Sequence, residues 1–186
     1  CEFCGAEIDY HEIIECIACA LDAKDSYTAG HSQRVSDMAL RVCKLLGLRA
    51  SDTEKIHIAA HLHDIGKIGI PDQILNKPSK LTDDEYNLIK QHPVIGAEIL
   101  KDITFIPHII DVARSHHERY DGKGYPDGIG GTDIPIHARI VSMADSYDAM
   151  NSRRIYRNAL PQAMIRDEIV KNRGTQFDPK IADVFL

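Results

Sequence analysis

The sequence has 186 residues and a mass of 20.8 kDa, enough chain for one domain with a sizeable hydrophobic core. Hydrophobic residues make up 44% of it and charged residues 27%, which excludes a disordered chain and a fibrous repeat. The 28 acidic residues exceed the 22 lysines and arginines, and the net charge of −6 argues against general binding to duplex nucleic acid.

The N-terminal segment is rich in cysteine. The chain begins with Cys1 rather than Met, so we expect it to be part of a longer protein. Five cysteines without a signal peptide or a membrane-spanning run favour a reducing, cytoplasmic location over a disulfide framework. Cys1 and Cys4, like Cys16 and Cys19, have the spacing of a zinc knuckle. Because the second pair falls in an amphipathic helical pattern, three interpretations stay open: a four-cysteine zinc site, a knuckle completed upstream, and a packing or incidental role.

Helical patterns follow one another along the rest of the chain. Apolar spacing predicts a helix at about 13–21 (Ile13, Ile14, Ile17, Leu21) and another at about 35–46. Capping-box sequences at 51–54 and 82–85 predict the starts of two more helices. Further helices are expected at about 136–150 and at 161–172, with Pro161 in the first turn and Gly174 as the stop. With no strand pattern and no repeat, the sequence predicts an all-α bundle with one glycine-rich loop at about 118–135.

Ten histidines are many for this length, and several stand beside carboxylates in separate predicted helices. The candidates for a shared site are five imidazoles and two carboxylates: His31, His63, His92, His116, His117, Asp64 and Asp145. Metal sites inside bundles are commonly built from facing helices, and imidazole with carboxylate suits iron, manganese or zinc. A carboxylate flanked by such ligands can bridge two cations ~3.5–4 Å apart, as in two-metal hydrolases.

From about residue 20 onward the chain resembles an HD-GYP domain, a branch of the HD metal-dependent phosphohydrolases that degrades cyclic di-GMP. The matching segments, in order, are Thr28–Val35, His63–Asp72, Gln91–Pro93, His116–Pro126, Ala138–Ile140, Ala144–Asp145, Asp148–Met150 and Gln176–Pro179. The resemblance implies an HD-type helical bundle over residues 20–186 with a metal centre in its core. Residues 1–19 would be a separate N-terminal segment.

By the same resemblance, seven side chains are metal ligands: His31, His63 and Asp145 for one cation, His92, His116 and His117 for a second, and Asp64 bridging both. Some family members hold a third metal with a glutamate four residues before the first histidine, but here that position is Tyr27. The sequence therefore predicts two divalent ions. Iron or manganese is expected, with zinc, nickel, cobalt or magnesium as alternatives.

The predicted reaction is attack on phosphorus by hydroxide formed from a water that two cations share. Asp64 and Lys67 are the catalytic candidates, because Lys67 resembles the family lysine that contacts the phosphate and follows Asp64 by three residues, on one helical side if the helix persists. Glu118 and Asp121 are expected to orient the ligands or the loop. Besides Lys67, the candidates for substrate binding are Gly124, Tyr125, Pro126, Arg154 and Arg157.

The leading functional prediction is a cytoplasmic bacterial phosphodiesterase that hydrolyses cyclic di-GMP to pGpG, with further hydrolysis to GMP left open. Another HD-type phosphohydrolase, acting on a different cyclic dinucleotide or nucleotide, is one alternative. A non-catalytic receptor or interaction module is the other, although none of the seven ligands is missing. The expected partners are cyclic di-GMP, an upstream sensor or receiver region, and a second copy of the chain.

The remaining histidines match no ligand position of the family. His57, His61 and Asp64 are spaced i, i+4, i+7, which by itself would suit a different metal triad. We interpret His57 and His61 instead as surface groups or as groups behind the ligands. Three further histidines are assigned no role: His11, His108 and His137.

Overall fold

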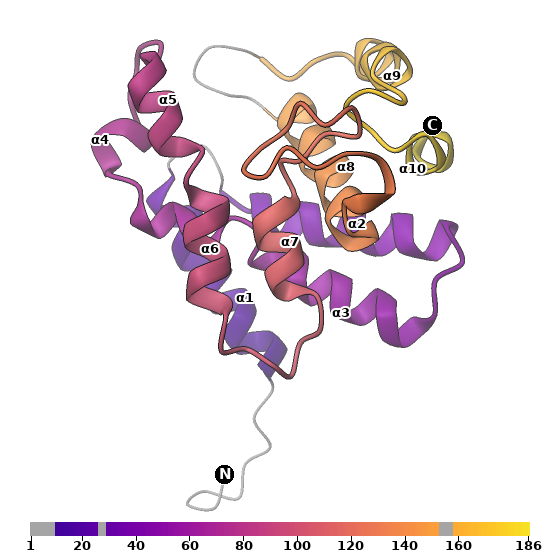
Figure 1. Cartoon of the computed structure of the whole chain (residues 1–186), viewed down its shortest axis with the longest axis horizontal. Coiled ribbons are helices and arrows are strands. Elements are labelled where there is room, and N and C mark those ends of the chain that lie inside the picture. The colour runs from indigo at the N-terminus through magenta and orange to yellow at the C-terminus, as the bar shows by residue number, and fades with distance from the viewer. Residues whose placement is uncertain (1–9, 26–28, 153–157) are drawn as a thin grey trace, which may run out of the picture.

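The computed structural model describes residues 10–25, 29–152 and 158–186. These ranges form a helical bundle (Figure 1), in which the only β pairing is a single bridge between Arg173 and Phe177. The α-helices are, in order, α1 (Tyr10–Lys24), α2 (His31–Leu45), α3 (Ala50–His61), α4 (Asp72–Leu75), α5 (Asp83–Ile89), α6 (His92–Leu100), α7 (Ile109–Ser115), α8 (Ile136–Asn151), α9 (Gln162–Lys171) and α10 (Pro179–Phe185). Two 3-10 helices, η1 (Ile65–Gly69) and η2 (Gly131–Asp133), lie between them. No described helix has both the length and the apolar character that crossing a bilayer requires.

The core lies where α2, α3, α7 and α8 pack on one another (Figure 1). In α2, Val35, Ala39 and Val42 recur at helical spacing and are fully buried, so one face of this helix is turned into the core. Helix α7 contacts α3, α6 and α8, and α6 contacts η1. Because α2 and α6 both begin with a histidine, this packing also fixes where two candidate site residues lie.

The predicted all-α class is confirmed, and α8 and α9 lie within one residue of their predicted bounds. The capping box at Thr82 is present: Thr82 Oγ1 accepts from Glu85 N, and the Glu85 carboxylate accepts from Thr82 N. The capping box predicted at 51–54 is wrong. The backbone N–H groups of Asp52 and Thr53 both donate to the Arg49 carbonyl, so the N-cap is Arg49 instead of Ser51 and the helix begins two residues earlier than predicted, at Ala50.

Helix α1 is continuous across the predicted boundary between residues 1–19 and 20–186, and it packs against α2, α3 and η1. Only part of its predicted apolar face is buried: Ile14 is inside, whereas Ile13 and Ile17 are 49% and 43% exposed. Cys16 and Cys19 are exposed free cysteines, so they have no packing role, and of the third interpretation only an incidental role stays open. Their zinc-knuckle partners, Cys1 and Cys4, lie outside the described residues, as does Tyr27.

Helix α3 ends at His61, and the chain then turns into η1. The helix therefore does not persist to Lys67. Gly66 explains how close η1 comes to α6: a Cβ built on Gly66 would lie 1.8 Å from the His92 carbonyl oxygen and 2.6 Å from Gly96 N. Only glycine permits this approach of two backbones, and it brings the His63–Asp64 turn up to the start of α6.

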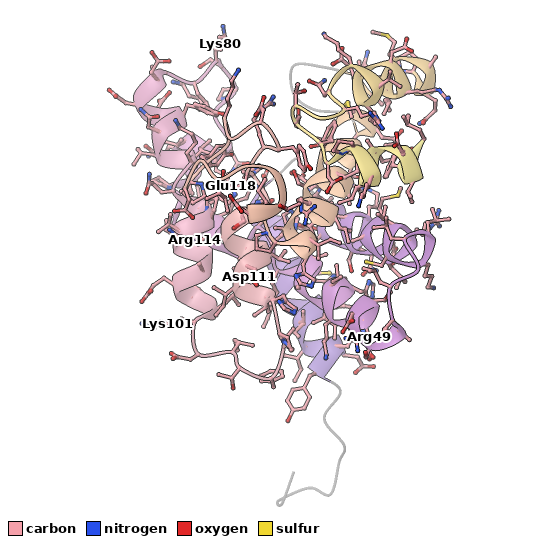
Figure 2. All side chains as sticks on the ribbon, turned by 45° about the vertical axis from the view of Figure 1, so that its right-hand side comes forward. Arg49, Lys80, Lys101, Asp111, Arg114 and Glu118 are labelled. Carbon is pink, nitrogen blue, oxygen red and sulfur yellow. The ribbon has the colours of Figure 1, made fainter. Side chains whose placement is uncertain are left out.

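The glycine-rich loop between α7 and α8 folds back on its own first residues. Glu118, inside the molecule in Figure 2, accepts hydrogen bonds at Oε1 from Asp127 N (2.7 Å) and Gly128 N (3.0 Å). Asp121 pairs with Arg119 and accepts from Lys123 N. These bonds agree with the predicted role of both carboxylates in shaping the loop.

Candidate metal centre

The seven predicted metal ligands all lie where helices begin or end, except for one on α8. His31 and His92 are the first residues of α2 and α6, where the backbone N–H groups have no partner within the helix. His63 and Asp64 occupy the turn after α3, His116 and His117 follow α7, and Asp145 is on α8. The packing of these helices brings all seven side chains together.

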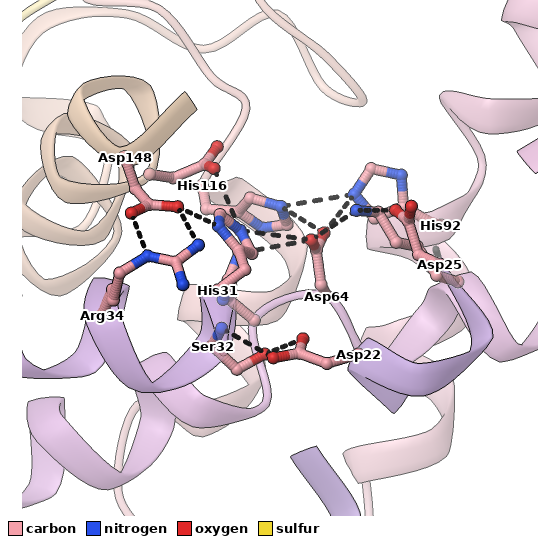
Figure 3. A network of polar contacts seen from close by, with 12 residues as sticks. Asp22, Asp25, His31, Ser32, Arg34, Asp64, His92, His116 and Asp148 are labelled. Carbon is pink, nitrogen blue, oxygen red and sulfur yellow. Dashed lines mark hydrogen bonds and ion pairs between the residues drawn. The ribbon is translucent and has the colours of Figure 1, made fainter. Parts of the chain in front are cut away.

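Asp64 lies at the centre of the group, as Figure 3 shows. Its Oδ1 is 3.2 Å from His92 Nε2 and 3.6 Å from His116 Nε2. Its Oδ2 is 3.4 Å from His63 Nε2 and 3.8 Å from His31 Nε2. The two oxygens of one buried carboxylate thus face two different sets of histidines.

The other ring nitrogen of each of these histidines is held from behind. Nδ1 of His63 is 2.7 Å from the Ala60 carbonyl, and Nδ1 of His92 is 2.7 Å from the Ile89 carbonyl. Nδ1 of His116 is 3.0 Å from the Val112 and Ala113 carbonyls. Such contacts fix the ring orientation and leave Nε2 as the nitrogen that faces the site.

His117 and Asp145 complete the two sets. The ring of His117 lies 4.2 Å from that of His116 and 4.9 Å from that of His92, centroid to centroid. One ligand atom from each of Asp64, His92, His116 and His117 lies within 4.8 Å of the others, and the same holds for His31, His63 and Asp64. Asp145 Oδ1 is 3.4 Å from His31 Nε2, so Asp145 lies on the side of His31 and His63.

Asp148 belongs to a matching motif but was given no role from the sequence, and it lies directly behind His31. Its Oδ2 is 2.7 Å from His31 Nδ1, and its carboxylate also accepts from the Arg34 guanidinium (Figure 3). Burial would raise the pKa of Asp148, but the bonds to His31 and Arg34 lower it to about 2. The spacing of three residues from Asp145 was the available signal, because it puts both carboxylates on one face of α8.

The pKa values of the ionisable groups in the site are strongly shifted. Burial alone would lower the pKa of His31, but hydrogen bonds to Asp145 and Asp148 and the nearby charge of Asp64 raise it to about 10. Burial lowers the pKa of His117 well below its usual value. The pKa of Asp64 is held well below its usual range, against burial, by Lys67 and the surrounding histidines.

A divalent cation fits these side chains. Within the described part of the chain, the fully buried His63 Nε2 has no hydrogen-bond partner. An imidazole nitrogen directed at a carboxylate among other imidazoles is a suitable ligand for iron, manganese or zinc. The buried His/Asp clusters are therefore consistent with a metal site.

Lys67 lies beside this site although η1 is not an α-helix. Its Nζ is 2.7 Å from Asp64 Oδ2 and 3.3 Å from Asp25 Oδ2. Burial would lower the pKa of Lys67, but these two carboxylates raise it, so the side chain stays a cation. Asp25, at the end of α1, is a second residue that the sequence reasoning missed, since no motif contains it.

A family model described as an HD domain matches residues 15–181, which carry all seven side chains. The chain belongs to the HD domain family. The resemblance drawn from the sequence motifs is thereby confirmed, and the buried His/Asp clusters are those expected of an HD-domain metal site.

The HD domain is similar to named proteins in several bacteria. It is 44% identical, over 94% of its length, to the cyclic di-GMP phosphodiesterase response regulator RpfG of Xanthomonas campestris, and 37% identical, over the same share, to the 3'3'-cGAMP-specific phosphodiesterase 2 of Vibrio cholerae. The chain covers only 47% and 34% of these two relatives, so it spans half of their length or less. A crystal structure of a cyclic GMP-AMP specific phosphodiesterase of V. cholerae (V-cGAP3) has the same fold, with a TM-score of 0.72 at 20% identity over 94% of this chain and 47% of that one.

The predicted substrate-binding residues of the HD domain are only partly described. Tyr125 stacks on His117 with ring centroids 4.8 Å apart and an interplanar angle of 27°, and Tyr125 N donates to the His117 carbonyl. A Cβ on Gly124 would lie 2.4 Å from Arg119 N, so glycine is needed for the loop to lie this close. Pro126 follows in the same loop. Arg154 and Arg157 lie outside the described residues.

Proposed function

We propose that this HD domain is a metal-dependent phosphodiesterase that hydrolyses cyclic di-GMP to pGpG. The observation that carries the proposal is the position of Asp64, whose two oxygens face separate sets of histidines. Similarity to RpfG, over nearly the whole chain, supports cyclic di-GMP as the substrate.

The proposed cofactor is a pair of divalent ions, iron or manganese in preference to zinc, nickel, cobalt or magnesium. One ion would be held by His31, His63 and Asp145, the other by His92, His116 and His117, and both by Asp64. When bound, such a pair lowers the pKa of water and neutralises charge on the phosphoryl oxygens.

The side chains around these ligands have distinct tasks. Asp148 holds Nδ1 of His31, so that Nε2 of the same ring faces Asp64. Lys67 contributes a fixed positive charge beside Asp64 for a phosphate oxygen, and because its pKa is raised it does not serve as a proton acceptor near neutral pH. Tyr125, stacked on His117, presents an aromatic ring to a base.

The test is anaerobic purification, metal analysis, and identification of products after incubation with cyclic di-GMP. We expect about two iron or manganese ions per chain and the appearance of pGpG, and the same product analysis shows whether hydrolysis continues to GMP. Turnover of another cyclic dinucleotide without turnover of cyclic di-GMP would overturn the substrate assignment. Binding of cyclic di-GMP without turnover by metal-loaded protein would favour the receptor alternative.

A second candidate substrate is 3'3'-cGAMP. The specific observation is that the relative from V. cholerae named as a 3'3'-cGAMP-specific phosphodiesterase matches the same 94% of this chain. Parallel assays with cyclic di-GMP and 3'3'-cGAMP under identical metal loading distinguish the two substrates by the ratio of their kcat/KM values.

The predicted partners belong to the same proposal. An upstream sensor or receiver region is in keeping with relatives of which this chain covers half or less. A homodimer formed through α1 is supported by Tyr10, Ile13 and Ile17, which recur at helical spacing and are 60%, 49% and 43% exposed. Sedimentation of the whole chain over a range of concentrations tests the dimer.

A further inference from the structure

A second histidine cluster lies between α1 and α3, outside the metal centre. His11 and Glu15 are four residues apart on α1, and His57 and His61 are four residues apart on α3. Each pair lies on one helix face, and the two helices are in contact. The three imidazole rings form a nearly equilateral triangle, with centroids 5.1, 5.1 and 5.4 Å apart.

The ligand atoms of this cluster converge. One ligand atom from each of His11, His57 and His61 lies within 4.8 Å of the other two. Glu15 Oε1 is 3.7 Å from His11 Nε2 and 4.0 Å from His61 Nε2. One carboxylate oxygen thus lies near two of the three imidazoles.

Two of the rings keep a nitrogen available for a ligand. Nδ1 of His57 is 2.6 Å from Ser36 Oγ and 3.2 Å from the Ser36 carbonyl, which leaves Nε2 for another partner. His61 is only 1% exposed, and its Nε2 has no hydrogen-bond partner among the residues that the structure describes. Since a buried polar atom without a partner is costly, a bound ion would satisfy it.

We propose that this cluster is a second metal site that binds one divalent transition-metal ion, with zinc as the preferred metal and His11, Glu15, His57 and His61 as the ligands. Three imidazoles and one carboxylate are a normal tetrahedral set for zinc. The dominance of nitrogen donors favours zinc, cobalt, nickel or copper over magnesium, calcium or manganese.

The cluster is accessible to an ion from solvent, and two of its side chains can move toward a bound ion. The side chains of His11 and Glu15 are 35% and 37% exposed, so the cluster opens to solvent on the α1 side. Zinc bonds of ~2.0–2.1 Å require the ligand atoms to come closer than they now are. Rotation of the two half-exposed side chains of α1 supplies that movement while His57 and His61 stay fixed.

The proposed ion would link α1 to α3. Lys24, at the other end of α1, donates to the carbonyls of Lys67, Ile68 and Ile70 in and after η1. The ion would therefore secure the docking of a helix that also supports the phosphodiesterase site, without belonging to that site. The proposal does not depend on which nucleotide the chain hydrolyses.

The test titrates the whole chain with Zn²⁺ and with Co²⁺, in an Asp64→Ala background that removes the shared ligand of the metal centre. The readouts are bound metal per chain, the ligand-field absorption of Co²⁺, and Tm. We expect one bound equivalent with a tetrahedral cobalt spectrum and a rise of Tm with zinc. Adding His11→Ala weakens this binding at least about tenfold.

Two substitutions serve as matched controls. Glu12→Ala changes an exposed carboxylate on α1, and His137→Ala changes a histidine of the separate cluster formed with His108 and Asp111. Both should leave the cobalt spectrum and the affinity unchanged. Absence of a bound equivalent, or affinity that His11→Ala leaves intact, would overturn the proposal. If Asp64→Ala does not fold, the loss of one equivalent between the unsubstituted chain and His11→Ala decides the question.

Discussion

The metal centre and the α1–α3 histidine cluster both consist mainly of histidines. His63 of the metal centre is only two residues from His61 of the other cluster. In the metal centre, carboxylates surround the histidines, and His31 contacts three of them. In the α1–α3 cluster, the carboxylate beside the imidazoles is that of Glu15, at 3.7 Å or more. The pKa of His31 is consequently raised to about 10, whereas burial and the neighbouring His57 and His11 lower that of His61 to about 4.

This difference shows that the number of carboxylates around a histidine cluster, and not the imidazoles themselves, decides which metal ions the cluster can bind. Several carboxylates with a shared aspartate can neutralise two cations close together, which suits phosphoryl transfer. A nitrogen-rich set with one carboxylate suits a single borderline metal in a structural role. Substitutions that affect one region and spare the other therefore test this division.

The largest effect is expected for Asp64→Asn. Loss of a carboxylate that faces both histidine sets should lower phosphodiesterase kcat/KM at least ~1,000-fold and remove most of the iron or manganese. Zinc binding at the α1–α3 cluster should persist. Steady-state kinetics and metal analysis measure both effects. The matched control is Asp183→Asn, an exposed carboxylate on α10, which should have nearly the activity of the unsubstituted chain.

Gly66→Ala should rank second. The added methyl group would overlap the His92 carbonyl, so η1 must move away from α6, at a cost of at least ~3 kcal/mol in the free energy of unfolding. Gly47→Ala is the control: it has open space but a φ of +70°, and should cost only ~1–2 kcal/mol. Urea unfolding of both variants compares the two values. Equal losses would mean that the contact between η1 and α6 is looser than described.

Asp148→Asn should have an intermediate effect. The amide keeps the shape of the side chain but loses the charge beside His31 and Arg34, so metal affinity and kcat should fall ~10–100-fold. Because the pKa of His31 would then drop, the pH profile of metal binding should change as well, which a loss of packing alone would not produce. Isothermal titration at several pH values follows this change.

The smallest effects are expected in the pH dependence of the stability of the metal-free protein. The two regions should change this stability with pH in opposite directions. The raised pKa of His31 contributes stability that is complete below about pH 6.5 and lost as the pH rises through about 10. The lowered pKa of His61 acts in the other direction: stability is lost as the pH falls from about 6.5 through about 4. Tm measured against pH in chelator should show both limbs.

Two variants show which histidine causes each limb of the curve of Tm against pH. His31→Gln should flatten the alkaline limb, and His61→Gln should reduce the acid limb. Part of the acid limb should remain in His61→Gln, because burial also lowers the pKa values of His116 and His117. An alkaline limb that His31→Gln leaves unchanged would contradict the assigned role of Asp148 and Asp145.

Much of the fold was predictable because it is local. The periodicity of α2, the capping box at Thr82 and the glycines of the long loop act within a few residues, and their effects are observed. The start of α3 was misplaced because Ser51 has the sequence of a cap, whereas the backbone bonds of Asp52 and Thr53 go to Arg49. The exposure of Ile13 and Ile17 was not predictable from apolar spacing, which does not say which neighbours a helix face will meet.

For the site, motifs predicted the residues but not their connections. Seven candidate ligands were named from recognisable segments, and all seven lie together. The pairing of Lys67 with Asp25 and the contact of Asp148 with His31 join residues 42 and 117 positions apart, and no local pattern encodes such distances. The α1–α3 cluster was not predicted for the same reason: His11 was assigned no role, and only the packing of α1 on α3 brings it beside His57 and His61.

The end of helix α1 contacts two parts of the metal centre: the start of α2, next to His31, and the segment around Lys67. Asp22 accepts from the backbone and hydroxyl of Ser32, the neighbour of His31, while Lys24 and Asp25 hold η1 and Lys67. A small tilt of α1 would therefore shift the start of α2 and Lys67 at the same time. Such a movement would not require the bundle to open, because α1 is joined to both places by these few polar contacts.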